Sequence, residues 1–284
     1  MVVTRIPDSG TVDPGVAGPT QKGPVAALGR LLPEDLGRDL SAIRDFVLLV
    51  RRRPTSLATD AQMRLHQIRA DLVRLYAGQA AELPQVEALR FLVAAGLPAD
   101  VPNLLVTGAL AEATAPTRST FDDVAERCAQ VADPIGSMVL WSVGRATPDR
   151  IALSGRICTG LRLLGCCRMV GVDARAGRVH LPTDDLHRFD VAVADLRRPS
   201  AGPAVRALLA FESTRALAWV DAGAPIVSTL RGWARLLAGL AIAQGRASAR
   251  SLADANYDPL TATPAPSAGE LASWWLRACV RRAG

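Results

Sequence analysis

The sequence contains almost no lysine and few aromatic residues. Lys22 is the only lysine among 33 lysine and arginine residues, and aromatic residues make up 4% of the 284 positions. Proteins that stack nucleic-acid bases place aromatic side chains among basic ones, and no basic run here does so; we therefore expect no nucleic-acid partner. The net charge of +6 comes almost entirely from arginine. The use of arginine in place of lysine is consistent with a GC-rich coding bias, and the surplus positive charge is consistent with binding of a small polyanion.

The sequence also lacks long apolar runs and the cysteine spacing of a disulfide framework. No apolar run reaches the roughly 18 residues that a bilayer span requires, and residues 236–243 are typical of a buried helix segment. The N-terminal residues do not follow the order of a signal peptide, in which a charged region precedes an apolar region and a small-residue cleavage site. The five cysteines are odd in number and lack paired C-x-x-C spacing, which favours a reducing compartment. The sequence therefore predicts a cytoplasmic protein without a transmembrane segment.

Helical periodicity dominates the chain from about residue 34, and no convincing set of alternating strands is present. In residues 34–50, Leu36, Leu40, Ile43, Val47 and Val50 follow helical spacing. Further helices are expected at 59–78, 87–96, 101–114, 119–132, 135–144, about 150–172, 202–223, 225–244 and 267–283, with a short helix after Pro182. The pattern predicts a single all-α domain. Residues 1–23 are rich in Pro, Gly and Thr and are expected to be a flexible lead-in.

Three consecutive arginines follow the first apolar helix, in the stretch FVLLVRRRPTSL at residues 46–57. One interpretation is a solvated helix end, where cations complement the helix dipole and Pro54 stops the helix. The other is a cluster that holds an anion. The residues alone leave both open.

Several stretches resemble the squalene/phytoene synthase family, and within it the bacterial squalene and hydroxysqualene synthases. They include ADPIGSMVLWSVGRATPDR, YDPLTATPAPS and, most specifically, GRVHLPTDDLHRF, which is similar to the family's G-R-x-Y-L-P-x-E-D-L. The likeness runs from about Pro24 to Ser267. It implies a class I isoprenoid synthase fold over residues 24–284, with helices around a central apolar cavity and a prenyl diphosphate as substrate.

The resemblance also shows where this chain departs from the family. Two aspartate-rich motifs of the family hold Mg²⁺ ions that bridge to the diphosphate. The first motif's aspartates fall on Arg51, Arg52 and Thr55. The second motif falls on residues 169–173, where Met169 begins it and only Asp173 remains. Mg²⁺ therefore stays possible as a cofactor, with Asp173 as its candidate ligand.

We expect arginines to replace metal and carboxylate at this site, because arginine binds phosphate oxygens directly. The candidate diphosphate ligands are Arg51, Arg52, Arg118 and Arg162. Asp173 is the candidate catalytic residue, with pairing to Arg175 or Arg178 at a helix end as the alternative. The expected cavity lining comprises Phe46, Gly165 and Met169.

The leading functional hypothesis is transfer of a short allylic, dimethylallyl-type group to an aromatic acceptor. Bacterial relatives of squalene synthase that prenylate carbazole-type metabolites are the type it resembles. Two alternatives stay open: a non-catalytic partner or isoprenoid-binding protein, and a divergent squalene-pathway enzyme. The acceptor, the donor chain length and the oligomeric state are not determined by the sequence.

Overall fold

A computed structural model describes residues 32–52, 58–114 and 119–266, and the regular structure of these residues is entirely helical. The all-α prediction is therefore confirmed. The helices are α2 (Glu34–Arg51), α3 (Ala58–Tyr76), α4 (Pro84–Glu87), α5 (Arg90–Ala94), α6 (Asp100–Thr114), α7 (Phe121–Ser142), α8 (Pro148–Arg175), α9 (Thr183–Arg188), the 3-10 turn η2 (Asp195–Arg197), α10 (Pro203–Gly223), α11 (Ile226–Thr229) and α12 (Gly232–Asp254). The helix expected at 267–283 and the lead-in at 1–23 lie outside the described residues.

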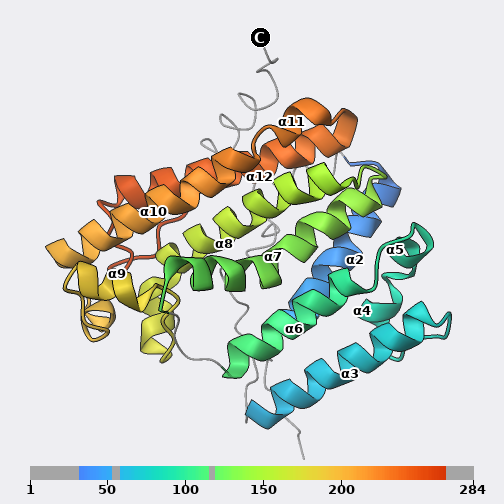
Figure 1. Cartoon of the computed structure of the whole chain (residues 1–284), viewed down its shortest axis with the longest axis horizontal. Coiled ribbons are helices and arrows are strands. Elements are labelled where there is room, and N and C mark those ends of the chain that lie inside the picture. The colour runs from blue at the N-terminus through green and yellow to red at the C-terminus, as the bar shows by residue number, and fades with distance from the viewer. Residues whose placement is uncertain (1–31, 53–57, 115–118, 267–284) are drawn as a thin grey trace, which may run out of the picture.

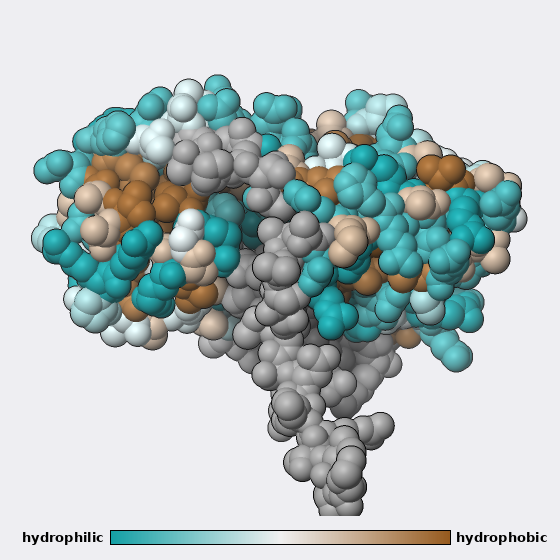
Figure 2. All heavy atoms as spheres, turned by 90° about the horizontal axis from the view of Figure 1, so that it is seen from below, coloured by the Kyte–Doolittle hydropathy of each residue, from teal (hydrophilic) through white to brown (hydrophobic). Residues whose placement is uncertain are grey.

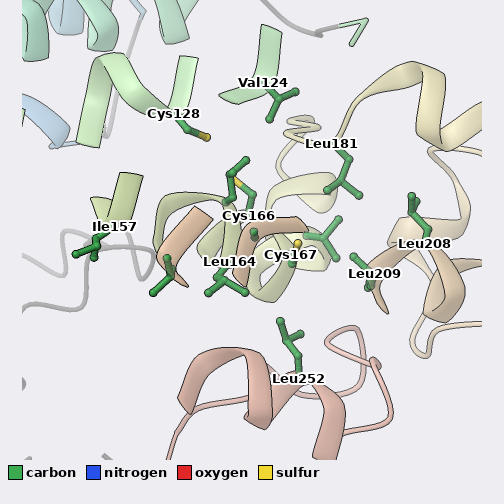
Figure 3. Close-up of a cluster of buried hydrophobic side chains, with 14 of the residues drawn as sticks. Val124, Cys128, Ile157, Leu164, Cys166, Cys167, Leu181, Leu208, Leu209 and Leu252 are labelled. Atoms are coloured by element: carbon green, nitrogen blue, oxygen red, sulfur yellow. The ribbon is translucent and has the colours of Figure 1, made fainter. Parts of the chain in front are cut away.

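Helix α8 lies at the centre of the molecule, with α7 on one side and α10 and α12 on the other (Figure 1). Helices α3 and α6 lie side by side farther from α8, and α2 contacts α6 and α7. Two apolar clusters follow from this layout. One joins α7, α8, α10 and α12, and Figure 3 shows its centre. The other joins α2, α3, α6 and the opposite face of α7. Helix α7 therefore packs against both apolar clusters, one on each of its faces.

Close packing of α8 against α10 depends on a residue without a side chain. A Cβ atom on Gly160 would lie 2.8 Å from the backbone oxygen of Ala216 and 2.8 Å from the backbone nitrogen of Val220. Real Cβ atoms do not approach backbone atoms this closely, because interiors are packed near the van der Waals limit. Gly160 therefore sets the distance between the two helices.

Helix α7 differs from the expected helix at 119–132. It begins at a capping box between Thr120 and Asp123, as its sequence predicts. It then continues through Pro134 to Ser142. Proline removes one helical hydrogen bond, but buried side chains on both sides, such as Val131 and Met138, hold the helix in place. Tertiary packing here outweighs the local signal.

The segment expected as one helix at 225–244 is also different. It breaks after α11, and Gly232 adopts a φ of +56° at the start of α12. Glycine tolerates this left-handed conformation without a steric penalty, so the chain turns there. Helix α12 then extends to Asp254, beyond the predicted end.

No helix within the described ranges is both long enough and apolar enough to cross a bilayer. Seen from below the view of Figure 1, the described surface is mostly hydrophilic, with separate apolar patches (Figure 2). The prediction of no transmembrane segment agrees with this finding.

Candidate functional site

Arg51 ends helix α2 against the side of α7. Its Nη2 donates a hydrogen bond to the backbone oxygen of Val131 at 2.5 Å. The side chain is half-buried, whereas the next residue, Arg52, is exposed. Arg53 and Thr55 lie outside the described residues. The contact places the C-terminal end of α2 beside the first half of α7.

Arg64 on α3 approaches the same helix end. Its Nη2 donates to the backbone oxygen of Arg52. Burial lowers the pKa of the Arg64 guanidinium, and the nearby positive charge of Arg52 lowers it further. The Nε of Arg64 is buried and has no hydrogen-bond partner among the described residues. We call Arg51, Arg52 and Arg64 the arginine cluster; it joins two helices that are separated by residues 53–57.

Helices α3 and α6 run antiparallel, which fixes what lies opposite Arg64. Tyr76 donates its hydroxyl to the backbone oxygen of Leu97 at 3.0 Å, and Arg69 donates to Thr107 Oγ1 at 2.9 Å. Continuing this register toward the start of α3 brings Arg64 to the level of the last turn of α6. That turn carries Glu112.

Glu112 is paired with Arg162, one of the residues expected to bind diphosphate. Arg162 Nη2 lies 3.2 Å from Glu112 Oε1, and the Arg162 side chain is only 10% exposed. The pair bridges α6 and α8. An ion pair of this kind balances much of the positive charge of Arg162, so its attraction for a second anion is reduced.

Two thiols lie beside this ion pair, Cys128 on α7 and Cys166 on α8 (Figure 3). The hydrogen bond between them lowers the pKa of Cys166 and raises that of Cys128, and the Arg162 charge lowers both. Both side chains are buried.

Asp173 lies at the other end of α8 and is also paired. Arg178 donates to its Oδ1 from Nη2 at 2.7 Å and from Nε at 3.2 Å, and His180 Nε2 lies 3.9 Å from Oδ2. The helix-end pairing considered as an alternative for Asp173 thus occurs, with Arg178. Arg162 and Asp173 share a helix face, but eleven residues at about 1.5 Å each separate them by about 16 Å.

The remaining candidates divide between buried and undescribed positions. Phe46 is fully buried among the side chains of α2, α3 and α6. Gly165 and Met169 are buried on α8. Arg118 lies outside the described residues. Within the described part of the chain, no three His, Cys, Asp or Glu side chains converge as metal ligands.

Three polar residues on these helices were not identified from the sequence: Arg64, Arg127 and Asp133. Asp133 on α7 accepts a hydrogen bond from Thr159 Oγ1 at 2.7 Å, and burial raises the pKa of its carboxyl to about 6. Arg127 lies on α7 between two buried apolar residues, Val124 of the cluster around α8 and Val131 of the cluster of α2, α3 and α6. A charged residue at a core-facing position is a signal that the sequence does contain.

Comparison with known proteins identifies the family. A sequence profile described as "Squalene/phytoene synthase" matches residues 24–272. Phytoene synthase from Cereibacter sphaeroides is 26% identical over 193 residues, which cover 64% of this chain and 54% of that protein. Phytoene synthase from Arthrospira platensis is 35% identical over 111 residues, covering 34% of this chain and 36% of that protein. The chain thus spans about half or less of these relatives.

Solved structures agree with this assignment. Squalene synthase HpnC from Alicyclobacillus acidocaldarius superposes with a TM-score of 0.75 at 26% identity, covering 82% of this chain and 88% of that one. A dehydrosqualene synthase superposes with a TM-score of 0.81 at 19% identity, covering 91% of each chain, which supports the fold alone. With the helical arrangement and the profile match over most of its length, the chain belongs to the squalene/phytoene synthase family.

Proposed function

We propose that this chain is a prenyltransferase that binds an allylic diphosphate at the arginine cluster. The donor is a short, dimethylallyl-type diphosphate, and the acceptor is an aromatic small molecule such as a carbazole. The observation that carries the proposal is the approach of Arg64 to Arg52 at the end of α2. Members of the family use prenyl diphosphates, so an anion of this kind belongs to the chemistry of the fold.

Electrostatics favour an anion between these arginines. Two guanidinium groups that approach each other repel, and the repulsion grows as burial lowers the local dielectric constant. A diphosphate replaces repulsion with charge-assisted hydrogen bonds, since each guanidinium can bind two phosphate oxygens. Binding of the anion would also reverse the lowering of the Arg64 pKa that Arg52 causes.

The chain's own residues then account for the chemical steps. The arginine cluster stabilises the negative charge that develops on the diphosphate as its carbon–oxygen bond breaks. Apolar side chains of α2 and α7, such as Phe46 and Val131, exclude water from the allyl cation. A ring carbon of the acceptor attacks the cation and then loses its proton. Asp173 is the proposed proton acceptor, held in place by Arg178.

The Mg²⁺ chemistry of the family does not fit the residues that this chain retains. A cluster of Mg²⁺ ions needs several carboxylates facing one another. The first motif supplies Arg51 and Arg52 instead, and the single carboxylate of the second, Asp173, is bound by Arg178. The proposed reaction therefore uses arginine side chains, not a metal ion, to hold the leaving group.

An aromatic acceptor is favoured over a second prenyl diphosphate by the same residues. Head-to-head condensation of two prenyl diphosphates needs two leaving-group sites. In this chain the position that begins the second aspartate motif is the buried Met169. One diphosphate site and an apolar interior suit an acceptor that carries no diphosphate.

A non-catalytic role is the second candidate, and two ion pairs favour it. Arg162 is paired with Glu112, and Asp173 with Arg178. Polar groups that satisfy one another within the protein need no substrate. In this alternative the chain would bind an isoprenoid or a partner subunit without turnover.

Product formation distinguishes the two candidates. The protein is incubated with dimethylallyl diphosphate and carbazole or indole, and prenylated product and released pyrophosphate are measured. We expect both, with strong losses in Arg52→Gln and Arg64→Gln. Arg250→Gln is the matched control, because Arg250 is an exposed arginine paired with Asp254 on α12. Binding of the diphosphate without turnover for any aromatic acceptor would favour the non-catalytic role.

A further inference from the structure

One arginine near the proposed site has a donor group that nothing in the described structure satisfies. Arg127 Nη1 is buried and has no hydrogen-bond partner among the described residues. Leaving a buried guanidinium donor without an acceptor is costly, and proteins rarely do so without a reason. A ligand that supplies the acceptor is one such reason.

The face of α7 that carries Arg127 points toward α2 and α6. Val131 lies one helical turn away on the same face, and it belongs to the apolar cluster of α2, α3 and α6. Arg51 donates to the backbone oxygen of this same Val131. Cys128, the next residue, belongs instead to the cluster around α8. Arg127 is therefore about one turn, near 6 Å along α7, from the residue that Arg51 contacts.

Helix α6 gives a second, independent placement. A Cβ on Gly108 would lie 2.7 Å from a methyl carbon of Val131, so Gly108 and Val131 face each other. The two helices run antiparallel, because Gly96, just before α6, faces Trp141 near the end of α7, whereas Gly108 faces Val131 in its middle. One turn farther along α6 and one turn back along α7 bring Glu112 opposite Arg127. Arg127 thus lies between the arginine cluster and the Glu112–Arg162 pair.

Carboxylates on the same helix are engaged elsewhere. Asp123 accepts the Thr120 backbone N–H in the capping box, and Glu126 accepts a hydrogen bond from Gln130. Glu112 is held by Arg162. Arginines from α2 and α7 lie near one another, because Arg127 is one turn from Val131, whose backbone oxygen Arg51 contacts.

We propose that Arg127 is a further diphosphate-binding residue, reaching from α7 to the oxygens of the same leaving group that the arginine cluster holds. The proposal rests on the proposed function, since it uses the same ligand. It assigns α7 a direct role in binding. A guanidinium on this helix, which packs against both apolar clusters, contacts the diphosphate on the side opposite α3. The guanidinium Nη1 would then gain the acceptor that it lacks.

Arg127→Gln and Arg127→Lys test the proposal by calorimetry with inorganic pyrophosphate and with dimethylallyl diphosphate. Loss of one charge-assisted hydrogen-bonding side chain should weaken binding about tenfold or more in Arg127→Gln. Arg127→Lys should retain part of the affinity, because lysine keeps the positive charge but cannot form bidentate hydrogen bonds to phosphate oxygens. Arg156→Gln, at an exposed arginine on α8, is the control and should bind as the wild type does.

Thermal melts distinguish a ligand-binding arginine from a structural one. In Arg127→Met the unsatisfied donor is gone, so the ligand-free protein should melt at the same or a higher temperature than the wild type. Pyrophosphate should raise the melting temperature of the wild type and much less that of the variant. A lower melting temperature in Arg127→Met, with pyrophosphate affinity unchanged in Arg127→Gln, would make the residue structural and overturn the proposal.

The experiment separates this inference from the proposed function. If wild-type protein binds neither pyrophosphate nor the prenyl diphosphate, both are wrong. If binding depends on Arg52 and Arg64 but not on Arg127, only the inference about Arg127 is wrong.

Discussion

A buried carboxylate on α10 makes the stability of this protein depend on pH. Glu212 is 3% exposed, and its Oε1 lies 2.6 Å from Nη2 of Arg215. The same guanidinium pairs with Asp185 of α9 and lies over the ring of Phe121, 3.9 Å from its centroid. Burial raises the pKa of Glu212 to about 7, although the charge of Arg215 opposes this shift.

The size of the effect follows from the two pKa values of Glu212. A glutamate in the unfolded chain titrates near its ordinary pKa of 4.5, and folding raises this pKa to about 7. At 1.36 kcal/mol per unit, this corresponds to about 3 kcal/mol. Because the folded-state pKa is the higher one, the contribution is fully present below the unfolded pKa. It is lost as the pH rises through the folded pKa near 7.

Glu212→Gln removes this titration. We expect the free energy of unfolding of the variant, relative to the wild type, to rise by about 3 kcal/mol between pH 4.5 and 8. Urea unfolding at several pH values measures it, with Asp254→Asn on the exposed part of α12 as the control. A difference between variant and wild type that does not change with pH would refute the reasoning, since it would mean that Glu212 is ionised throughout.

Three other predictions concern the site and the core. Calorimetric binding of a prenyl diphosphate should survive EDTA, because the carboxylates of the described residues do not converge as a metal cluster; complete loss would show that a metal is required. Replacing Arg51 and Arg52 together by aspartate should abolish binding and also lower the melting temperature, because Arg51 is half-buried and donates to the Val131 oxygen; unaltered affinity would make these arginines structural. Gly160→Val should destabilise the protein by about 1–3 kcal/mol or more through overpacking of α8 against α10, measured by urea unfolding; a stability equal to that of the wild type would contradict the close approach.

The fold was predictable because its signal is local. Spacing of apolar residues along the chain predicts helices, and the capping box at Thr120 fixes where α7 begins. The break before α12 and the passage of α7 through Pro134 were not predicted, since packing between distant helices decides them. The placement of Arg51 at a helix end was readable from the residues around it.

The polar contacts of the site divide in the same way. Asp173 and Arg178 are five residues apart at one helix end, and their pairing was a stated alternative. Arg162 and Glu112 are separated by fifty residues and belong to helices whose register no local pattern reveals. Without that register, Arg162 was expected to bind diphosphate and its partner was not recognised.

The positions of the arginines help to decide whether the replacement of aspartates by arginines reflects a retained anion site or loss of function. Loss of function through relaxed selection should scatter substitutions over the site without making them converge. Here Arg64 from α3 donates to the backbone oxygen of Arg52, and Arg127 from α7 lies about one turn from Val131, whose backbone oxygen Arg51 contacts. Arg64 lies close enough to Arg52 for the Arg52 charge to lower the Arg64 pKa, so the two cations repel each other. An anion that binds both would relieve this repulsion, which favours the proposed anion site over decay.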